Sequence, residues 1–438
     1  MDRSSKGTAF IQWAEEVPAD WSSVRLRNLL TSVLAGSWGY DPGSSDIDLL
    51  CARIADFDWN RLEIRDENIH TRRSYTHDQA KRFVLESGDL LVEKSGGGEK
   101  HPVGRCVQYQ GEGGPAFANF AMRLRVNESV SSGFLCYSLA ASYYRGHSWK
   151  ILNQTTGIQN LDVSAFRSSP IPLPPRAEQR AIVDFLDAKT AEIDGLVGKL
   201  ERQVELLERY RRELIAHTVT RGLDPDVPMK DSSIEWIGDI PSHWAEASLK
   251  SMLRRVSVKN KPKRRVLSVE RVNGVVDRET EGSPDNHNRL PDNLSAYLAV
   301  DRGQFAMNKM KAWRGSYGIS RLDGIVSPAY YVFDLNHPNP EFFNWAIRSD
   351  AYIPFFGRDS YGIRTDQWDF KMSALRSIPF FSPPMSEQAA IVAYLEKETQ
   401  VIDSTIEGIR KQIELLGKYR KQVINDAVTG KVRVGEVA

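Results

Sequence analysis

Two stretches of the chain carry apolar residues at alternating steps of three and four, the spacing typical of a long helix that packs along another helix. Each stretch follows a Pro-Pro pair and has Glu-Gln in its first turn, as expected at a helix N-terminus. We therefore predict long helices over 176–221 and 385–431, the first helical for about 43 residues or ~65 Å. The seam positions that we assign are Ile193, Leu196, Leu200, Gln203, Leu207, Tyr210 and Leu214 in the first helix, and Ile402, Thr405, Ile409, Gln412, Leu416, Tyr419 and Val423 in the second.

Both predicted seams are interrupted by a glutamine at the same place. Gln203 and Gln412 are each the fourth of seven seam positions, so antiparallel pairing would set them opposite each other at the centre. A buried amide is costly unless it has a partner, and a central pair of amides would therefore fix the register of the two helices. The alternative is that each helix packs only against its own globular part.

The two helical segments are copies of one sequence. Residues 174–220 recur as 383–429 with a constant shift of 209 and no gap, and 20 of the 47 positions are identical. A shorter match opens each half, at 17–21 and 240–244, so the chain alternates globular part, helix, globular part, helix. The boundaries that we predict are an N-terminal segment 1–16, a first globular domain 17–175, a helix 176–221, a linker 222–239, a second globular domain 240–384, a helix 385–431 and a tail 432–438.

The globular parts have the pattern of mixed α and β structure. Residues 89–93 and 329–333 are short, apolar and rich in β-forming residues, whereas 341–351 follow a helical pattern. We therefore predict an α+β fold with two globular domains, each followed by a long helix, and the two helices pairing as an antiparallel coiled coil with an internal pseudo-twofold.

Composition narrows the class of protein. The chain of 438 residues is 41% hydrophobic and 26% charged, as in folded proteins, and it has no apolar run near the ~20 residues that cross a bilayer. We expect a soluble, cytoplasmic protein without a membrane partner. Its three cysteines form no CxxC pair, which argues against a disulfide framework or a zinc cluster.

Charge is distributed unevenly between the halves. The whole chain carries +1, which argues against binding nucleic acid by bulk charge. Residues 17–175 hold 17 basic and 17 acidic side chains, whereas 240–384 hold 21 basic and 15 acidic. Any DNA-binding surface must therefore be local, and the second domain is the more electropositive.

Motifs for catalysis are weak. Ser382-Pro383-Pro384-Met385 lacks the aromatic residue with which a DNA adenine methyltransferase stacks its flipped base. Asp89, Glu93 and Lys94 have nuclease residue types, but the adjacent Glu and Lys of a strand point to opposite faces. Residues 96–100 lack the frame of a P-loop, and the histidines form no metal-binding pair. We assign neither catalytic nor metal-binding residues.

The duplicated entry into a long helix resembles the specificity (S) subunit of type I DNA restriction-modification systems. Residues 169–175 read SPIPLPP and are followed by Glu178-Gln179, and residues 377–388 have a similar arrangement. Residues 156–161, TGIQNL, look like the TGI.NL stretch of that family, and 308–330 are similar to one version of its target recognition domain. The second half departs from the first because Ser360-Tyr361-Gly362-Ile363-Arg364 replaces TGI.NL, which indicates two subtypes of recognition domain.

The resemblance implies a non-catalytic DNA reader within a larger complex. In that family each half carries one recognition domain for one part of a split, asymmetric double-stranded DNA target. The helices separate the two domains and dock two methyltransferase (M) subunits, which restriction (R) subunits join afterwards. S-adenosylmethionine is then expected on the M subunits, with no cofactor in this chain. Two domains held by a rigid helix pair suit half-sites about one DNA turn apart, ~34 Å.

Several basic, polar and aromatic side chains are candidates for DNA contact, because cations anchor phosphates and planar groups read or stack on bases. The strongest group is the one around Trp313, where glycines give the backbone access and three cations are close in sequence. For each candidate, ordinary surface or packing roles remain open. The candidates are Arg72, Arg73, Lys94, Ser95, Lys100, Arg105, Thr155 and Gln159 in the first domain, and Lys259, Lys261, Lys263, Arg264, Lys309, Lys311, Trp313, Arg314, Arg358, Tyr361 and Arg364 in the second.

Two other functions are compatible with parts of the sequence. A coiled-coil scaffold whose globular parts bind proteins instead of DNA would suit the near-neutral charge. An enzyme fused to a recognition function is the other possibility, and the missing cofactor and base-flipping loops argue against it. A test of methyl transfer by the chain alone distinguishes the enzyme from the reader.

Overall fold

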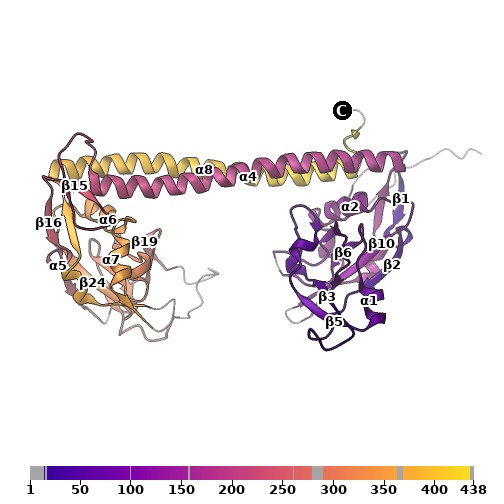
Figure 1. Ribbon diagram of the computed structural model, residues 1–438, viewed down its shortest axis with the longest axis horizontal. Coiled ribbons are helices and arrows are strands. Elements are labelled where there is room, and N and C mark those ends of the chain that lie inside the picture. The colour runs from indigo at the N-terminus through magenta and orange to yellow at the C-terminus, as the bar shows by residue number, and fades with distance from the viewer. Residues whose placement is uncertain are drawn as a thin grey trace, which may run out of the picture. The chain divides into compact units, whose positions relative to one another are not determined.

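The structure is a computed structural model that describes residues 14, 17–98, 100–155, 158–259, 261–278, 290–362 and 368–434. The chain divides into two compact units: unit 1 is Met1–Glu201 with Lys411–Ala438, and unit 2 is Arg202–Arg410. Each unit contains one globular domain and segments of two long helices, which Figure 1 labels α4 and α8. We call the globular parts domain 1 and domain 2.

Domain 1 is built around a five-stranded sheet in the order β2-β10-β6-β8-β4. Two three-stranded sheets, β5-β3-β9 and β11-β12-β7, and the pair β1-β13 complete it. Its helices are α1 (His77–Phe83), α2 (Ser132–Tyr144) and α3 (Val163–Ser168). Its strands are β1 (Ser22–Arg25), β2 (Leu30–Ala35), β3 (Ile47–Ala52), β4 (Glu63–Ile64), β5 (Arg72–Tyr75), β6 (Leu90–Glu93), β7 (Ser95–Gly96), β8 (Cys106–Tyr109), β9 (Ala116–Phe117), β10 (Ala121–Val126), β11 (Leu152–Thr155), β12 (Ile158–Leu161) and β13 (Pro170–Leu173).

Domain 2 has a different sheet arrangement, with a four-stranded sheet β17-β24-β21-β22 and the pairs β14-β15, β16-β27, β18-β19, β20-β23 and β25-β26. Its helices are α5 (Leu249–Met252), α6 (Pro340–Arg348) and α7 (Ile353–Arg358). Its strands and those of the preceding linker are β14 (Met229–Asp231), β15 (Asp239–Pro241), β16 (Ala245–Ser248), β17 (Leu253–Val256), β18 (Leu267–Glu270), β19 (Gly274–Asp277), β20 (Leu298–Val300), β21 (Phe305–Asn308), β22 (Tyr317–Ile319), β23 (Gly324–Val326), β24 (Tyr330–Leu335), β25 (Ser360–Tyr361), β26 (Asp369–Phe370) and β27 (Pro379–Ser382).

Both long helices contribute to the core of each unit. In unit 1, Leu186 of α4 and Ile424 of α8 belong to the same hydrophobic cluster as Phe134 of α2. In unit 2, Ile215 of α4 and Leu395 of α8 share a cluster with several phenylalanines of domain 2. Burial of apolar surface contributes a free energy of about 25 cal/mol per Å². It therefore stabilises the packing of each domain on its helix segments.

The entry into each helix repeats the same contacts. Antiparallel β1-β13 in unit 1 and β16-β27 in unit 2 both join the start of a domain to the segment before its helix. The Trp21 indole N–H donates to Glu178 at 3.0 Å, and the Trp244 indole N–H donates to Glu387 at 3.1 Å. The sequence match at 17–21 and 240–244 thus includes the tryptophan through which each domain contacts the first turn of its long helix.

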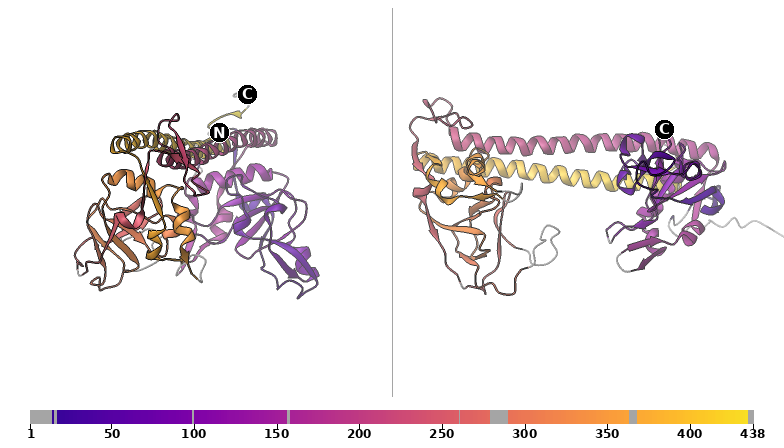
Figure 2. Two further views of the ribbon diagram at one scale, coloured as in Figure 1. Left: turned by 60° about the vertical axis from the view of Figure 1, so that its left-hand side comes forward. Right: turned by 60° about the horizontal axis from the view of Figure 1, so that its bottom comes forward.

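Helix α4 spans Arg176–Arg221, and α8 spans Met385–Val428. The helices lie side by side in Figures 1 and 2, and they run antiparallel in each unit. Asp194 of α4 pairs with Arg420 of α8 in unit 1, whereas Arg211 of α4 pairs with Asp403 of α8 in unit 2. The predicted fold class is confirmed.

The structure corrects the predicted seam at every second position. Ile193, Leu200 and Leu207 are buried or half-buried as expected, but Leu196 and Tyr210 are 43% and 53% exposed. At these positions the side chain that turns toward the other helix is the next residue in the sequence. The corrected seam residues are Val197, Val204 and Arg211 in α4, and Ile406, Ile413 and Arg420 in α8.

Gln203 and Gln412 are exposed, so the predicted burial of two central amides is wrong. Tyr419 is exposed as well, whereas Ile402, Ile409, Leu416, Val423 and Leu214 are buried or half-buried. The physical reason is that steps of four and three from Ile193 satisfy the heptad as well as steps of three and four, and the structure selects the former. The interruption of the seam is therefore an arginine in each helix, Arg211 and Arg420.

Candidate nucleic-acid interface

In unit 2, cations lie over aromatic rings on the strands β17 and β24, on the segment after β21 and around the β25-β26 pair. The backbone N–H of Phe370 donates to the Lys309 carbonyl at 3.1 Å, which ties β26 to the end of β21. We call the resulting set the aromatic–basic cluster. Its members are Arg255, Lys309, Lys311, Trp313, Arg314, Tyr331, Tyr361, Trp368 and Lys371.

Two tryptophans form the centre of the cluster. The rings of Trp313 and Trp368 are 4.9 Å apart at their centroids, tilted by 35°, and the Arg314 guanidinium lies 4.2 Å from the Trp313 ring centroid. A guanidinium over an indole face is an attractive cation–π contact, and its N–H groups remain available for a further acceptor. The Trp313 indole N–H is buried and has no hydrogen-bond partner among the described residues.

The other cations of the cluster also lie over aromatic rings. Lys309 Nζ is 4.7 Å and the Arg255 guanidinium 5.2 Å from the Tyr331 centroid, and Lys371 Nζ is 5.3 Å from that of Tyr361. Tyr361 is 61% exposed. Burial raises the pKa of Tyr331 above its ordinary value, so its phenol, like that of any unperturbed tyrosine, is neutral at pH 7. Over the described ranges, no ion pair involves Lys309, Lys311 or Arg314.

The remaining candidates of domain 2 lie elsewhere or are already paired. Lys259, Lys261 and Lys263 are exposed on the segment between β17 and β18, and Arg264 pairs with Asp301 at 2.6 Å. Arg358 at the end of α7 pairs with Asp359 at 3.0 Å. Arg364 lies outside the described residues. Sequence reasoning missed Arg255, Tyr331, Trp368 and Lys371, which are distant in sequence from Trp313.

In domain 1, two candidate arginines are held by carboxylates. Arg73 on β5 pairs with Asp41 at 2.8 Å and lies over Trp38. Arg105 pairs with the buried Glu93 at 2.8 Å, and its guanidinium lies 3.7 Å from the centroid of the Trp59 ring. Arg72 is exposed on the same strand as Arg73.

A second group of candidates in domain 1 surrounds the β7-β12 pairing. Gln159 lies opposite Gly96 in the register, and Ser95 Oγ donates to Asn160 Oδ1 at 2.7 Å. The Gln159 side chain is buried, and its carbonyl oxygen has no hydrogen-bond partner among the described residues. Lys94 is half-buried and Lys100 is exposed, while Thr155 belongs to β11.

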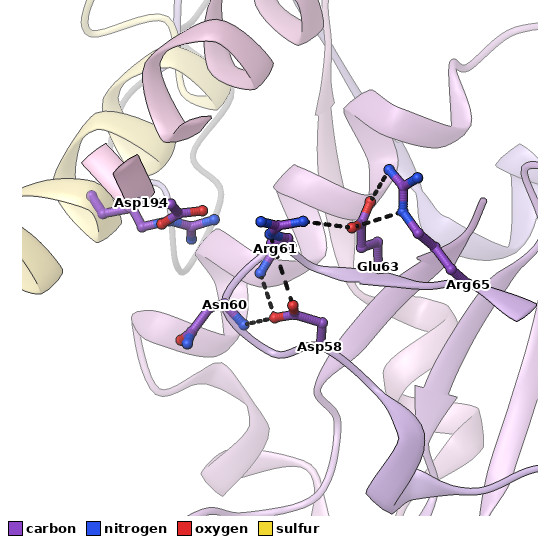
Figure 3. A network of polar contacts seen from close by, with 7 residues as sticks. Asp58, Asn60, Arg61, Glu63, Arg65 and Asp194 are labelled. Carbon is purple, nitrogen blue, oxygen red and sulfur yellow. Dashed lines mark hydrogen bonds and ion pairs between the residues drawn. The ribbon is translucent and has the colours of Figure 1, made fainter. Parts of the chain in front are cut away.

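Domain 1 also has an exposed polar network that the sequence did not indicate. Figure 3 shows Glu63 with Arg65, 3.0 Å away, and Arg61, whose Nη1 is 3.8 Å from Glu63. Arg61 is in turn held by Asp58. In the part of the chain that the structure describes, no cluster of His, Cys, Asp and Glu is arranged to hold a metal ion. The helices among those residues include none long and apolar enough to cross a membrane.

Three comparisons with known proteins bear on this arrangement. Residues 68–206 match a family model described as the type I restriction modification DNA specificity domain. The chain is 23% identical to the putative type I restriction enzyme MjaX specificity subunit of Methanocaldococcus jannaschii, over 96% of this chain and 95% of that protein. It is 24% identical to the type I restriction enzyme EcoKI specificity subunit of Escherichia coli, over 84% and 82% of the two chains.

Solved structures show the same fold. A chain from a type I restriction-modification system superposes with a TM-score of 0.67 at 14% identity, covering 95% of this chain and 100% of that one. The HsdS subunit from Thermoanaerobacter tengcongensis gives a TM-score of 0.52 at 15% identity, covering 95% and 98%.

Proposed function

Because the chain belongs to the family of type I restriction-modification specificity subunits, we propose that it reads an asymmetric DNA target in two separate blocks. Domain 1 reads one block and domain 2 reads the other. The chain itself is not a catalyst. It positions M subunits, which carry S-adenosylmethionine and transfer the methyl group, and R subunits join the complex afterwards.

The observation that carries this proposal is that two different domains are attached to the long helices by the same set of contacts. The strand pairing and the Trp-Glu hydrogen bond at the helix entry occur once in each unit with almost the same geometry. The domains themselves differ, because the largest sheet has five strands in domain 1 and four strands in domain 2. Two identical readers would favour a symmetric target, so unlike readers favour an asymmetric one.

The aromatic–basic cluster supports DNA contact by domain 2. Lys311 and Arg314 are exposed cations without a carboxylate partner in the described ranges, as needed to replace the counterions of phosphates. Arg314 also presents a planar group that suits either a phosphate or the acceptor edge of guanine.

Two equivalent apolar patches support the docking of two M subunits. Leu206 and Tyr210 of α4 lie in unit 2, and their repeat mates Leu415 and Tyr419 of α8 lie in unit 1. All four side chains are about half exposed. An apolar residue pair that is repeated on the solvent side of two helices is typical of a surface that a partner covers. Two copies of the same pair suit two copies of one partner.

Reconstitution tests the proposed function. The purified chain should bind DNA of the target sequence and show no methyl transfer when S-adenosylmethionine is added. Methyl transfer to that DNA should appear when the M subunit is supplied. Methyl transfer by the chain alone, or a reconstituted complex that methylates DNA without sequence preference, would contradict the proposal.

Variants test the docking surface separately. Leu206→Ala with Tyr210→Ala should remove one of two bound M subunits, as should Leu415→Ala with Tyr419→Ala, and the four-residue variant should bind none. Analytical ultracentrifugation of the mixtures gives the masses. Val401→Ala is the matched control, because Val401 is an exposed apolar residue of α8 outside the patches. An unchanged complex mass for all variants would place docking elsewhere.

A further inference from the structure

Two ion pairs join the long helices at equivalent positions of the repeat. In unit 1, Arg420 Nε is 3.2 Å from Asp194 Oδ1, and the Arg420 side chain is buried. In unit 2, the Arg211 guanidinium binds both oxygens of Asp403, at 2.8 and 3.1 Å. Arg211 and Arg420 are repeat mates, and so are Asp194 and Asp403. Both arginines take seam positions, where an apolar residue would be expected.

The residue after each arginine contacts the globular domain at or just beyond the end of one of its helices. In unit 1, Lys421 Nζ lies 5.3 Å from the ring centroid of Tyr144, the last residue of α2. In unit 2, Arg212 Nε lies 3.6 Å from Asp350, two residues after α6 ends. Each unit therefore has a joint in which α4, α8 and the globular domain meet. We call these the Arg420 joint and the Arg211 joint.

Each joint lies at the edge of the apolar attachment of its domain. Along the helix that carries the aspartate, the nearest residue of the shared hydrophobic cluster is Leu186 for Asp194 and Leu395 for Asp403, eight residues or ~12 Å away. Along the helix that carries the arginine, the cluster begins within four residues, at Ile424 in unit 1 and at Ile215 in unit 2. An apolar patch alone leaves a domain free to tilt about it. Directional polar contacts at the edge of the patch restrict that tilt.

We propose that Asp194 with Arg420, and Asp403 with Arg211, are positioning residues that hold each recognition domain at a fixed angle to the helix pair, and that this angle sets the spacer length accepted between the two blocks of the DNA target. This inference rests on the proposed function. It assigns to the joints a role in specificity, in addition to their contribution to stability.

The two joints differ in strength. Arg420 has a side-chain exposure of 9% and Asp194 of 26%, whereas Arg211 and Asp403 have 32% and 53%. Removing one partner of a buried pair leaves an uncompensated charge, while an exposed pair is screened by water and contributes little. Spacer selectivity should therefore depend more on the Arg420 joint than on the Arg211 joint.

Binding to DNA with altered spacers tests the proposal. The probes are duplexes with both blocks at the spacer found by methylation mapping, duplexes with that spacer changed by one or two base pairs, and duplexes with a single block. Arg420→Gln should lower the preference for the natural spacer about fivefold, which is less than the full cost of leaving a buried charge unpaired because Asp194 is partly exposed. Single-block binding should be unchanged. Arg211→Gln should lower it less than twofold.

Controls separate positioning from folding. The exchanged pair Asp194→Arg with Arg420→Asp should restore the spacer preference, because the opposite charges are kept. Glu213→Gln removes an exposed ion pair within α4, to Arg209, and should change nothing. Without DNA, spin labels on domain 1 and on α4 should give a broader distance distribution in Arg420→Gln than in the natural chain.

Each outcome decides one question. A spacer profile and a spin-label distribution that stay sharp in Arg420→Gln, even with lowered thermal stability, would overturn the positioning role. A natural chain that binds DNA with no dependence on the spacer would instead overturn the proposed two-block reading, and in that case the spin-label result still decides whether the joint orients the domain.

Discussion

Domains 1 and 2 are attached to their helices by the same contacts, but the candidate arginines over their tryptophan rings differ in one respect. In domain 1, Arg73 and Arg105 lie over tryptophan rings and are also held by Asp41 and Glu93. In domain 2, Arg314 lies over Trp313 with no carboxylate partner in the described ranges, and the domain has the larger excess of basic residues. A repeat of the scaffold therefore does not imply a repeat of the binding chemistry. Domain 2 is suited to contribute more of the salt-dependent affinity.

The largest effect is expected for Arg105 in domain 1. Arg105→Ala leaves Glu93 buried without its partner and removes the stack on Trp59, so it should lower the free energy of unfolding by about 2–3 kcal/mol. Thermal denaturation with hydrogen exchange in β6 and β8 measures the change. The double variant with Glu93→Gln should recover part of the loss. Equal stability of Arg105→Ala and the natural chain would show that this arginine is free for DNA.

Removal of two cations of the aromatic–basic cluster should affect binding and leave folding intact. Lys311→Ala with Arg314→Ala should weaken DNA binding roughly tenfold at 0.2 M salt and lower the slope of log affinity against log salt by about 2. Fluorescence anisotropy across a salt series gives both values. Lys397→Ala, an exposed lysine of α8, is the charge control. Unchanged affinity at physiological salt would exclude this loop from the interface.

A histidine in each domain should make both units sensitive to acid. Burial lowers the pKa of His147 in domain 1 and of His337 in domain 2 below the ordinary histidine value of about 6.5. The unfolded chain then binds more protons near pH 6 than the folded chain, so stability is full above pH 6.5 and falls as the pH drops below it. Urea titrations at pH 7.5 and 5.5 measure the loss. His147→Gln should reduce it in domain 1 only; an equal loss in that variant would assign the effect to other groups.

The smallest effects are expected at glycines inside the helices. A methyl group on Gly195, Gly198 or Gly417 in unit 1 would meet no atom within 4 Å, and the same holds for Gly408 in unit 2. Each Gly→Ala change should stabilise its helix by up to about 1 kcal/mol. Thermal denaturation of the single variants tests this. A lower melting temperature for Gly198→Ala would indicate an unrecognised contact at that position.

The sequence predicted the two helices and their repetition because a gapless match at a fixed shift records duplication directly. It did not predict the phase of the seam. Leu196 and Val197 are both apolar, so the pattern from Ile193 can continue with either, and Tyr210 is a better apolar residue than Arg211. Only the contact with Asp403 on the other helix makes Arg211 a seam residue.

The candidate interface was predicted in part. Lys309, Lys311, Trp313 and Arg314 are neighbours in sequence, and the structure keeps them on one surface. Trp368 joins them through the β25-β26 pairing, which local sequence does not encode. The ion pairs of Arg73 and Arg105 likewise depend on carboxylates from other strands and loops, so the sequence alone could not separate structural arginines from free ones.

Mapping the methylated sites in cells that express this chain with its M subunit tests the two-block reading most directly. We expect one asymmetric motif made of two unlike blocks with a spacer of fixed length, and exchange of domain 2 for a different recognition domain should alter one block only. A palindromic motif, a single continuous block, or a motif in which both blocks change on exchange of domain 2 would contradict the assignment of one block to each domain.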